Sequence, residues 1–353
     1  MENPLCVDNE KLVKNFGAKK ISEIKDLPSF YTFEKELIYS HRDFDKFFEK
    51  LKKGEKSAIV SGVNASGTLH LGHKVVFDTN LFFQKKYNIP VFIPISDDES
   101  YVAGKVETQK QAKENAIELA KEMLAYGFDP KNTFFIIDNI YTNIYNLAFK
   151  MSKKINYSEI KATYGYNPET NIGLHFYPAV QTAHVLYPQE ILGIKNVLVP
   201  IGPDEDAHLR IARDIAQRLN IPKPSVLHLK FIEGLDGKKA SKSKNNTIFL
   251  KDNEKQIIKK CNSAFSGGQD TIELHKKLGG NPDIDIACQY LKNYYYNEEQ
   301  TKELFEKYKK GELLSGEVKK LLSQEIIKEL KMFQENIKKI DLKTLDKCIL
   351  KNN

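Results

Sequence analysis

The stretch Ser57-Ala-Ile-Val-Ser-Gly-Val-Asn-Ala-Ser-Gly-Thr-Leu-His-Leu-Gly-His73 decides the fold of this chain. Its first four residues form a short run bounded by Gly62, which is typical of a buried parallel strand. Residues 61–69 predict a loop, and a helix is expected from His70 to about residue 86. This order of elements places His70 and His73 at a helix N-terminus, where phosphate binds well. The alternative is two polar residues at a helix start, with Gly72 allowing close packing.

A second short stretch, Lys239-Ala-Ser-Lys-Ser243, complements the first. The Gly, Asp, Ser and Asn residues around it predict an exposed loop. Lysine is a compact charge suited to phosphate, and a loop that closes at the transition state would stabilise a departing pyrophosphate. Taken alone, the stretch could equally be a solvated basic loop. Together, in this order, the two stretches predict a site that holds a nucleoside triphosphate from both ends.

Strand-like and helical segments alternate over the first 250 residues. The strand-like runs after the first lie at residues 91–95, 133–138, 197–200 and 226–229, and the helical patterns at 105–126, 140–163, 177–192 and from beyond Gly202 to about 219. This alternation predicts an α/β fold with a Rossmann-like doubly wound parallel sheet. After residue 251 the pattern turns helical, so an all-helical C-terminal domain should follow. We expect an N-terminal extension at 1–50, a catalytic domain at 51–250 and a helical domain at 251–353.

Composition narrows the class of protein. The chain has 353 residues, 41% of them hydrophobic, and a net charge of +7, which permits nucleic-acid binding without proving it. It contains neither an apolar run long enough for a membrane span nor a secretory signal, so a cytoplasmic location is expected. The four cysteines show no CxxC spacing, which argues against a disulfide framework or a zinc site. We predict no metal-binding residues.

A family resemblance extends this interpretation. The residues His70-Leu-Gly-His73 resemble the HIGH motif of class I aminoacyl-tRNA synthetases, and Lys239-Ala-Ser-Lys-Ser243 resembles their KMSKS motif. The wider sequence is most similar to tryptophanyl-tRNA synthetases of the archaeal and eukaryotic branch, over about residues 10–340. The stretches that carry this similarity are Ser40-His-Arg-Asp-Phe44, Gly127-Phe-Asp-Pro-Lys-Asn-Thr133, Tyr177-Pro-Ala-Val-Gln181, Pro200-Ile-Gly-Pro-Asp-Glu-Asp206, Leu209-Arg-Ile-Ala-Arg-Asp214, Ala264-Phe-Ser-Gly-Gly-Gln-Asp270 and Gly279-Gly-Asn-Pro-Asp-Ile-Asp285.

The resemblance implies a two-step reaction. Tryptophan and ATP, accompanied by Mg²⁺ and without an organic cofactor, would form tryptophanyl-adenylate and pyrophosphate. The acyl group would then move to tRNA(Trp). The resemblance also implies a Rossmann catalytic domain, an anticodon-binding role for the helical domain, and a homodimer.

The resemblance also implies the site residues. His70, His73, Lys239 and Lys242 would be catalytic. The ATP site would comprise these four with Ser66, Gly67, Gly72, Gly202, Asp204, Ser241 and Ser243. The amino-acid site would comprise Val60, Gly62, Glu99, Gln181, His184 and Glu205. The chain departs from the family at the indole N–H, where Val60 and Pro94 replace the usual Tyr and Gln. Asp97 or Glu99, a main-chain carbonyl near Val60, His184 or a water molecule could accept that hydrogen instead.

Three alternatives remain at this point. A tyrosyl-tRNA synthetase typically carries Tyr-x-x-x-Gln-x-x-Asp, but here His184 stands at the Asp position. Without that Asp a buried phenol hydroxyl would lack its partner. An inactive synthetase paralogue that binds RNA would not need both signatures intact. A small nucleotidylyltransferase would share the HxGH turn but not the helical C-terminal domain.

Overall fold

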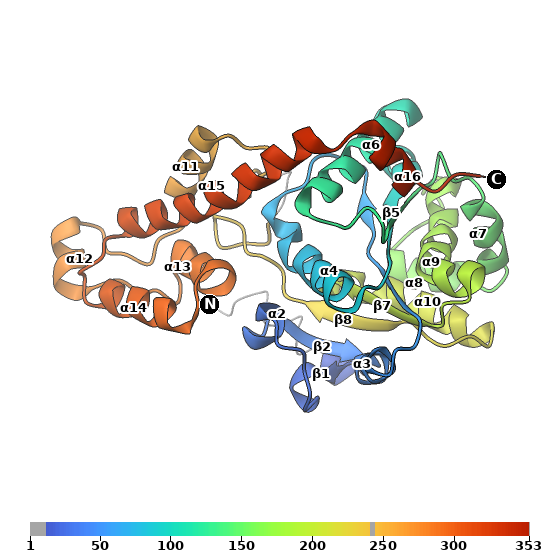
Figure 1. Cartoon of the computed structure of the whole chain (residues 1–353), viewed down its shortest axis with the longest axis horizontal. Coiled ribbons are helices and arrows are strands. Elements are labelled where there is room, and N and C mark those ends of the chain that lie inside the picture. The colour runs from blue at the N-terminus through green and yellow to red at the C-terminus, as the bar shows by residue number, and fades with distance from the viewer. Residues whose placement is uncertain (1–11, 241–243, 353) are drawn as a thin grey trace.

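The computed structural model describes residues 12–240 and 244–352, and it is built around one mixed sheet (Figure 1). Eight strands of the described residues form this sheet, in the order β1-β2-β8-β7-β3-β5-β4, and β6 also pairs with β5. The strands are β1 (Lys19–Lys20), β2 (Ile38–Arg42), β3 (Ser57–Val60), β4 (Val63–Asn64), β5 (Val91–Ser96), β6 (Thr133–Ile137), β7 (Asn196–Ile201) and β8 (Ser225–Leu229).

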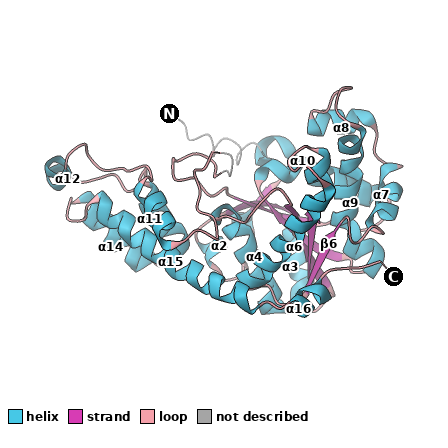
Figure 2. Ribbon diagram, turned by 90° about the horizontal axis from the view of Figure 1, so that it is seen from above, coloured by secondary structure: helices cyan, strands magenta, loops and turns pink. Residues whose placement is uncertain are grey.

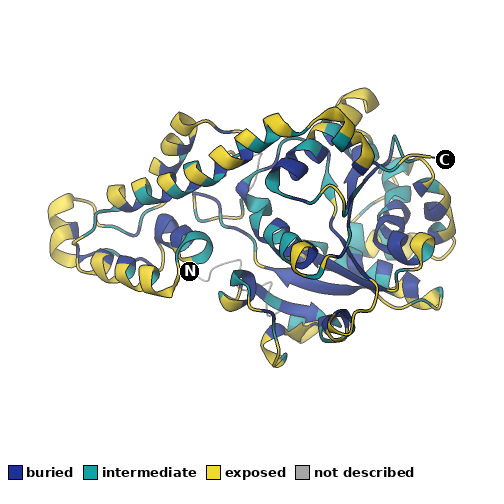
Figure 3. Ribbon diagram, viewed as in Figure 1, coloured by how far each residue is buried: buried dark blue, intermediate teal, exposed yellow. Residues whose placement is uncertain are grey.

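The centre of the sheet is parallel. Strands β3, β5, β6, β7 and β8 pair in parallel with one another, as in Ile59 opposite Val91. Every residue of β3, β5, β7 and β8 is buried (Figure 3), because helices cover both faces of the sheet. The predicted Rossmann-like parallel sheet is confirmed, and each predicted strand lies within two residues of its expected bounds.

Part of the segment expected as an N-terminal extension joins this sheet. Strand β2 pairs antiparallel with β8, with His41 opposite Leu227, and β1 pairs with β2. The sequence pattern did not predict β2, because the strand buries polar side chains. These side chains find partners, since Ser40 Oγ lies 2.8 Å from His228 Nδ1 and His41 Nδ1 accepts the Phe44 N–H at 3.1 Å.

Helices pack on both faces of the sheet (Figures 1 and 2). Those that precede residue 251 are the 3₁₀ turns η1 (Ile21–Glu23), η2 (Leu71–His73) and η3 (Pro203–Glu205), and the helices α2 (Tyr31–Glu34), α3 (Phe44–Lys52), α4 (Lys74–Tyr87), α5 (Asp97–Val102), α6 (Gln109–Tyr126), α7 (Ile144–Ser152), α8 (Tyr157–Tyr164), α9 (Ile172–Leu192) and α10 (Asp206–Arg218).

Capping side chains set helix starts that hydrophobic periodicity had misplaced. The helix expected at 140–163 is in fact two helices, α7 and α8, because Asn156 caps a new helix by accepting the Glu159 N–H. Helix α9 begins at Ile172 instead of residue 177, since Asn171 caps it. Likewise α6 begins after its cap Thr108. The helix expected from His70 opens with η2 before α4.

After residue 251 the described elements are all helical, as predicted. They are α11 (Glu254–Asn262), α12 (Ile272–Leu278), α13 (Ile286–Tyr290), the π-helical turn η4 (Leu291–Tyr295), α14 (Glu298–Lys309), α15 (Ser315–Lys339) and α16 (Leu342–Cys348). Helix α15 runs from α11 back to α6 (Figure 1). Near the C-terminus, the Leu350 N–H donates to the Phe135 carbonyl of β6. No described helix has the length and apolar character that a membrane crossing requires.

One hydrophobic cluster runs through both parts of the chain. It contains Phe77 and Phe83 of α4 together with Leu322 and Ile326 of α15, all at most 1% exposed. The tyrosines Tyr294, Tyr295 and Tyr296 also pack against this cluster. The helical part is therefore held against the sheet by a continuous core.

Candidate active site

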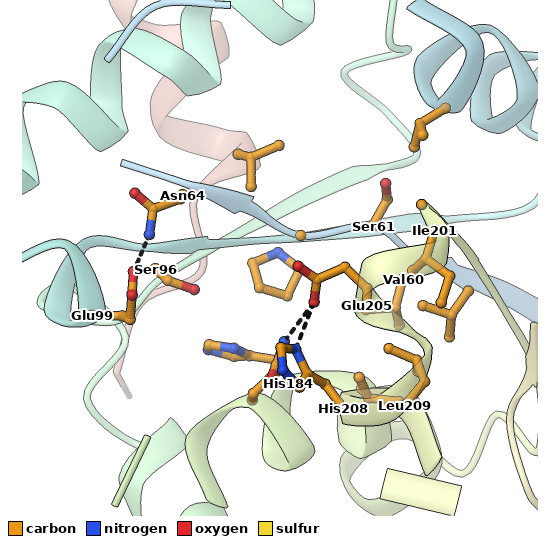
Figure 4. A pocket seen from close by; sticks show the side chains of 18 of the residues that line it. Val60, Ser61, Asn64, Ser96, Glu99, His184, Ile201, Glu205, His208 and Leu209 are labelled. Carbon is orange, nitrogen blue, oxygen red and sulfur yellow. Dashed lines mark hydrogen bonds and ion pairs between the residues drawn. The ribbon is translucent and has the colours of Figure 1, made fainter. Parts of the chain in front are cut away.

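A cavity of about 420 Å³ opens at the carboxyl ends of β3, β5 and β7, between these strand ends and helices α9 and α10 (Figure 4). Open α/β sheets bind their ligands at this edge. Apolar side chains such as Val60, Pro94 and Val199 form one part of its wall. Carboxyl, amide and imidazole groups form the other part, so the cavity suits a ligand that is both apolar and charged.

The two histidines of the first signature lie side by side at the start of α4. Their ring centroids are 4.3 Å apart, and His73 Nδ1 lies 3.0 Å from the His70 backbone oxygen. The Gly72 N–H donates to His70 Nδ1 at 3.0 Å. A neutral imidazole that accepts at Nδ1 carries its proton on Nε2. His70 can thus donate from Nε2 at a helix N-terminus, as a phosphate site requires.

Gly72 is needed for this arrangement. A Cβ atom added at Gly72 would lie 2.5 Å from His70 Cε1 and 2.6 Å from His70 Nδ1. Contacts this short do not occur, so a side chain here would displace the His70 ring. The glycine between the two histidines therefore permits the bond that orients His70.

The lysine loop approaches the other side of the same region. Lys239 Nζ lies 2.7 Å from Asp204 Oδ2, and it lies 3.8 Å from the centre of the Phe231 ring. Both members of this ion pair are about half exposed. A residue expected at the phosphates is thus paired with the residue expected at the ribose. Ser241, Lys242 and Ser243 lie outside the described residues.

Two carboxylates face the cavity. Glu99, in the first turn of α5, accepts hydrogen bonds from Asn64 and from Lys105 Nζ, the latter at 2.8 Å (Figure 4). Glu205 Oε2 lies 2.9 Å from His208 Nδ1 and accepts from Gln181 at 3.4 Å. Burial raises the pKa of Glu205, but these hydrogen bonds outweigh it and hold the pKa below its usual value. An anionic Glu205 can attract an ammonium group.

Tyr164 holds this part of the wall together. Its hydroxyl donates to Gln181 Oε1 at 2.7 Å, and its ring stacks on His208 with centroids 4.2 Å apart. Gln181 therefore has a fixed amide orientation, with its oxygen toward Tyr164 and its nitrogen toward Glu205.

His184 lies one helical turn beyond Gln181 on α9 and is 2% exposed. Its Nε2 lies 2.7 Å from Asp138 Oδ1, just after β6. Burial lowers the pKa of His184 to about 4, with nearby carboxyls opposing the shift. The imidazole is therefore neutral at physiological pH, although it contacts a carboxyl group.

A buried acidic cluster surrounds this histidine. One carboxyl oxygen each from Asp97, Asp98 and Asp138 lies within 4.8 Å of the others. Burial, and then the neighbouring Asp138, raises the pKa of Asp98 to about 8. Asp98 therefore holds a proton at neutral pH and donates it in the hydrogen bond to Asp138, whose own pKa burial raises well above its usual value. Carboxyl oxygens are ligands for hard cations, but this shared proton is enough to explain how the cluster is buried.

The structure brings most of the predicted site residues to one place. The predicted residues that line the cavity are Val60, Gly62, Gly72, His73, Glu99, Gln181, His184, Gly202 and Glu205. Ser66, Gly67, His70, Asp204 and Lys239 do not line it, but His70 contacts His73, and Asp204 follows Gly202. The predicted ATP and amino-acid residues thus meet around Gly72 and Gly202.

Several lining residues escaped the sequence analysis. They include Asn64, Lys105, Tyr164, Tyr166 and His208. His208 could have been suggested by its spacing, because it lies three residues after Glu205 and so on the same helix face. Tyr164 and Tyr166 lie just before α9 in a segment without a recognisable motif, and nothing in the sequence indicates that they reach the cavity.

Comparison with known proteins agrees with this geometry. Residues 52–331 match the protein family described as "tRNA synthetases class I (W and Y)". The tryptophan–tRNA ligase of Methanocaldococcus jannaschii is 38% identical over 362 residues, covering 98% of this chain and 97% of the relative. The cytoplasmic tryptophan–tRNA ligase of Saccharomyces cerevisiae is 37% identical over 365 residues, covering 98% of this chain and 84% of the relative.

Solved structures extend the similarity to three dimensions. The tryptophanyl-tRNA synthetase of Aeropyrum pernix superposes with a TM-score of 0.89 at 29% identity, covering 98% of this chain and 97% of that one. The Plasmodium falciparum tryptophanyl-tRNA synthetase gives a TM-score of 0.87 at 32% identity, covering 96% of both chains. The chain therefore belongs to the class I tRNA synthetases, and within them to the tryptophan–tRNA ligase family.

Proposed function

We propose that this chain is a tryptophan–tRNA ligase that activates tryptophan with ATP and transfers it to tRNA(Trp). The observation that carries this proposal is the cavity at the strand ends, which combines an apolar wall with Glu99 and Glu205 and opens beside His73. The apolar wall suits an indole, and the carboxylates suit an ammonium group. The helix start suits the phosphates of ATP.

In the first step, a carboxylate oxygen of tryptophan attacks the α-phosphorus of ATP, and the bond from that phosphorus to the pyrophosphate oxygen breaks. His70 and His73 donate hydrogen bonds to the phosphates from the start of α4. Lys239 and Lys242 meet the negative charge that develops on the departing pyrophosphate. Gly72, Ser66 and Gly67 let the chain approach the nucleotide, while Gly202 and Asp204 lie at its ribose. Mg²⁺ enters with ATP as part of that substrate.

The amino acid lies along α9. Glu99, Gln181 and Glu205 hold the ammonium group, with Tyr164 fixing the orientation of the Gln181 amide. Val60 and Gly62 border the indole side. In the second step a ribose hydroxyl at the tRNA end attacks the acyl carbon of the adenylate, and AMP leaves.

The helical part, 251–353, would bind the anticodon region of tRNA(Trp), and the enzyme would act as a cytoplasmic homodimer. A relative from Saccharomyces cerevisiae is named as cytoplasmic. Light scattering at micromolar concentration should give twice the mass of one chain, and a monomer would contradict the dimer.

Amino-acid-dependent ATP–pyrophosphate exchange, run with each of the twenty amino acids, tests the proposal directly. Tryptophan should drive exchange and tyrosine should not. If tyrosine drove exchange at least as well as tryptophan, the chain would instead be a tyrosyl-tRNA synthetase. Absence of exchange with every amino acid would support an inactive paralogue.

A further inference from the structure

We propose that His184 is the residue that reads the indole N–H of the substrate, accepting it at Nδ1 while Asp138 holds the ring at Nε2. This inference rests on the proposed function, because it concerns the tryptophan that the cavity takes. It assigns the acceptor that Val60 and Pro94 cannot provide.

An acceptor is required inside this cavity. The indole is mostly apolar, but a buried N–H without a partner costs about 1–3 kcal/mol. The apolar part of the wall, formed by Val60, Pro94, Val185 and Val199, offers no side-chain acceptor. The partner must therefore come from the polar side chains of α9 or from the strand ends.

Three other polar side chains on that wall already have partners. Both ends of the Gln181 amide are bonded, one to Tyr164 and the other to Glu205. The Tyr177 hydroxyl lies 2.8 Å from Ser96 Oγ. Glu99 accepts from Asn64 and Lys105. These oxygens could each accept a further hydrogen bond, but their existing partners already satisfy them.

His184 differs in having one bonded nitrogen and one nitrogen with no hydrogen-bond partner among the described residues. Its Nε2 is fixed by Asp138 Oδ1 at 2.7 Å, and the residue both lines the cavity and is 2% exposed. A neutral imidazole that donates from Nε2 keeps a lone pair on Nδ1. That lone pair is an acceptor on a residue that lines the cavity.

The acidic cluster sets this tautomer. Burial raises the pKa of Asp98, to about 8, and also that of Asp138, but the hydrogen bond between them raises the pKa of Asp98 and lowers that of Asp138, so Asp98 is the donor of the pair. Asp138 is then free to act as the acceptor for Nε2 of His184. Burial also lowers the pKa of His184 to about 4, so the ring is not doubly protonated at neutral pH. Doubly protonated imidazole would have no lone pair to offer.

The test compares tryptophan with its sulfur isostere, β-(3-benzothienyl)alanine, which has the same shape but no N–H. The chain contains no tryptophan of its own. Fluorescence excited at the red edge of the tryptophan absorption band, where tyrosine does not absorb, therefore reports the bound tryptophan directly. The affinity for the isostere is measured from its ability to displace bound tryptophan. The wild-type enzyme should bind tryptophan about ten- to hundredfold more tightly than the isostere, from the loss of one partnered hydrogen bond.

His184→Phe is the decisive variant. It keeps an aromatic ring in this position but removes both ring nitrogens, and it introduces no oxygen that could accept the indole N–H instead. The two ligands should then bind within about threefold of each other. Gln181→Ala, one turn earlier on α9, is the matched control: it should weaken both ligands alike and leave their ratio as in wild type.

Asp138→Asn provides a second, independent variant should His184→Phe fail to fold, as thermal melting would reveal. It keeps the imidazole but removes the carboxylate that fixes the tautomer, so the preference for tryptophan should fall. An unchanged ratio in either folded variant, or equal binding of both ligands by wild type, overturns the assignment of His184. Failure of the proposed function would give a different result: the wild-type enzyme would show no tryptophan-dependent ATP–pyrophosphate exchange.

Discussion

Lys74 of α4 and Glu329 of α15 form a largely buried ion pair, with Nζ 2.6 Å from Oε1. Lys74 directly follows His73, so this contact ties the start of α4 to the helical part of the chain. Asp78 also pairs with Lys74, and the Tyr295 hydroxyl donates to Glu329. Burial lowers the pKa of Lys74, but the two carboxylates outweigh it and leave the pKa raised. The ammonium group therefore stays charged.

We expect Glu329→Ala to lower the free energy of unfolding by about 3 kcal/mol, the lower end for a broken buried pair, because Asp78 remains as a partner. Urea denaturation measures this loss. Lys331→Ala on the same helix is the control, since its pair with Glu254 is exposed and such pairs contribute at most about 1 kcal/mol. Equal effects of the two substitutions would show that the Lys74 contact does not anchor the helical part.

Arg42 of β2 holds the N-terminus of α10. Its guanidinium donates to both oxygens of Asp206, at 2.7 and 2.8 Å, beside the loop that carries Gly202. Arg42→Ala should cost about 3 kcal/mol, the lower end for a broken buried pair, because Arg210 and His228 remain beside Asp206. Arg42→Lys should recover only part of this loss, since lysine cannot form the two-pronged contact. Full recovery in urea unfolding by the lysine variant would contradict this account.

We also expect the Asp206 carboxylate to make the free energy of unfolding depend on pH. Burial alone would raise the pKa of Asp206, but hydrogen bonds from His228 and Arg42 hold it well below its usual range. The unfolded chain therefore binds more protons once the pH falls through about 4, and the stability contributed at neutral pH is lost progressively from there down to the lower pKa of the folded state. Between about pH 5 and about pH 3, urea denaturation should show that the free energy of unfolding falls more steeply in wild type than in Asp206→Asn. Parallel curves would place the stabilising charge elsewhere.

Gly72→Ala should impair activation more than stability. The added Cβ would meet His70 Cε1 at 2.5 Å and push the imidazole away from the Gly72 N–H. Misplacing a positioning group by about 1 Å can cost on the order of a hundredfold in rate. Single-turnover adenylate formation should slow accordingly. Gly316→Ala is the control, because a Cβ there meets nothing within 4 Å, and its activation rate should match wild type.

Lys239→Ala should slow adenylate formation on the order of 10²–10³-fold, as expected for a lost contact to developing charge. Stability should hardly change, because the ion pair with Asp204 is exposed. Lys238→Ala, at the exposed neighbouring position, should behave like wild type in single-turnover assays. A normal activation rate in the Lys239 variant would remove this lysine from the catalytic group.

The sequence by itself determined the parallel centre of the sheet and the two signatures. Strands such as β3 and β7 are buried on both faces, so their apolar runs stand out without any knowledge of their neighbours. The spacing of His70 and His73 is also local, because three residues separate neighbours on one helix face. These features follow from short stretches of chain and could be read from them.

Only the tertiary structure decided which distant groups meet. Strand β2 carries Ser40, His41 and Arg42, and such a polar segment is buried only because β8 and α10 supply partners. The role that we propose for His184 likewise depends on Asp138, 46 residues away, which fixes the ring nitrogen that donates. The partner and protonation state of a buried polar group depend on its whole surroundings, and packing brings those surroundings together from distant parts of the chain.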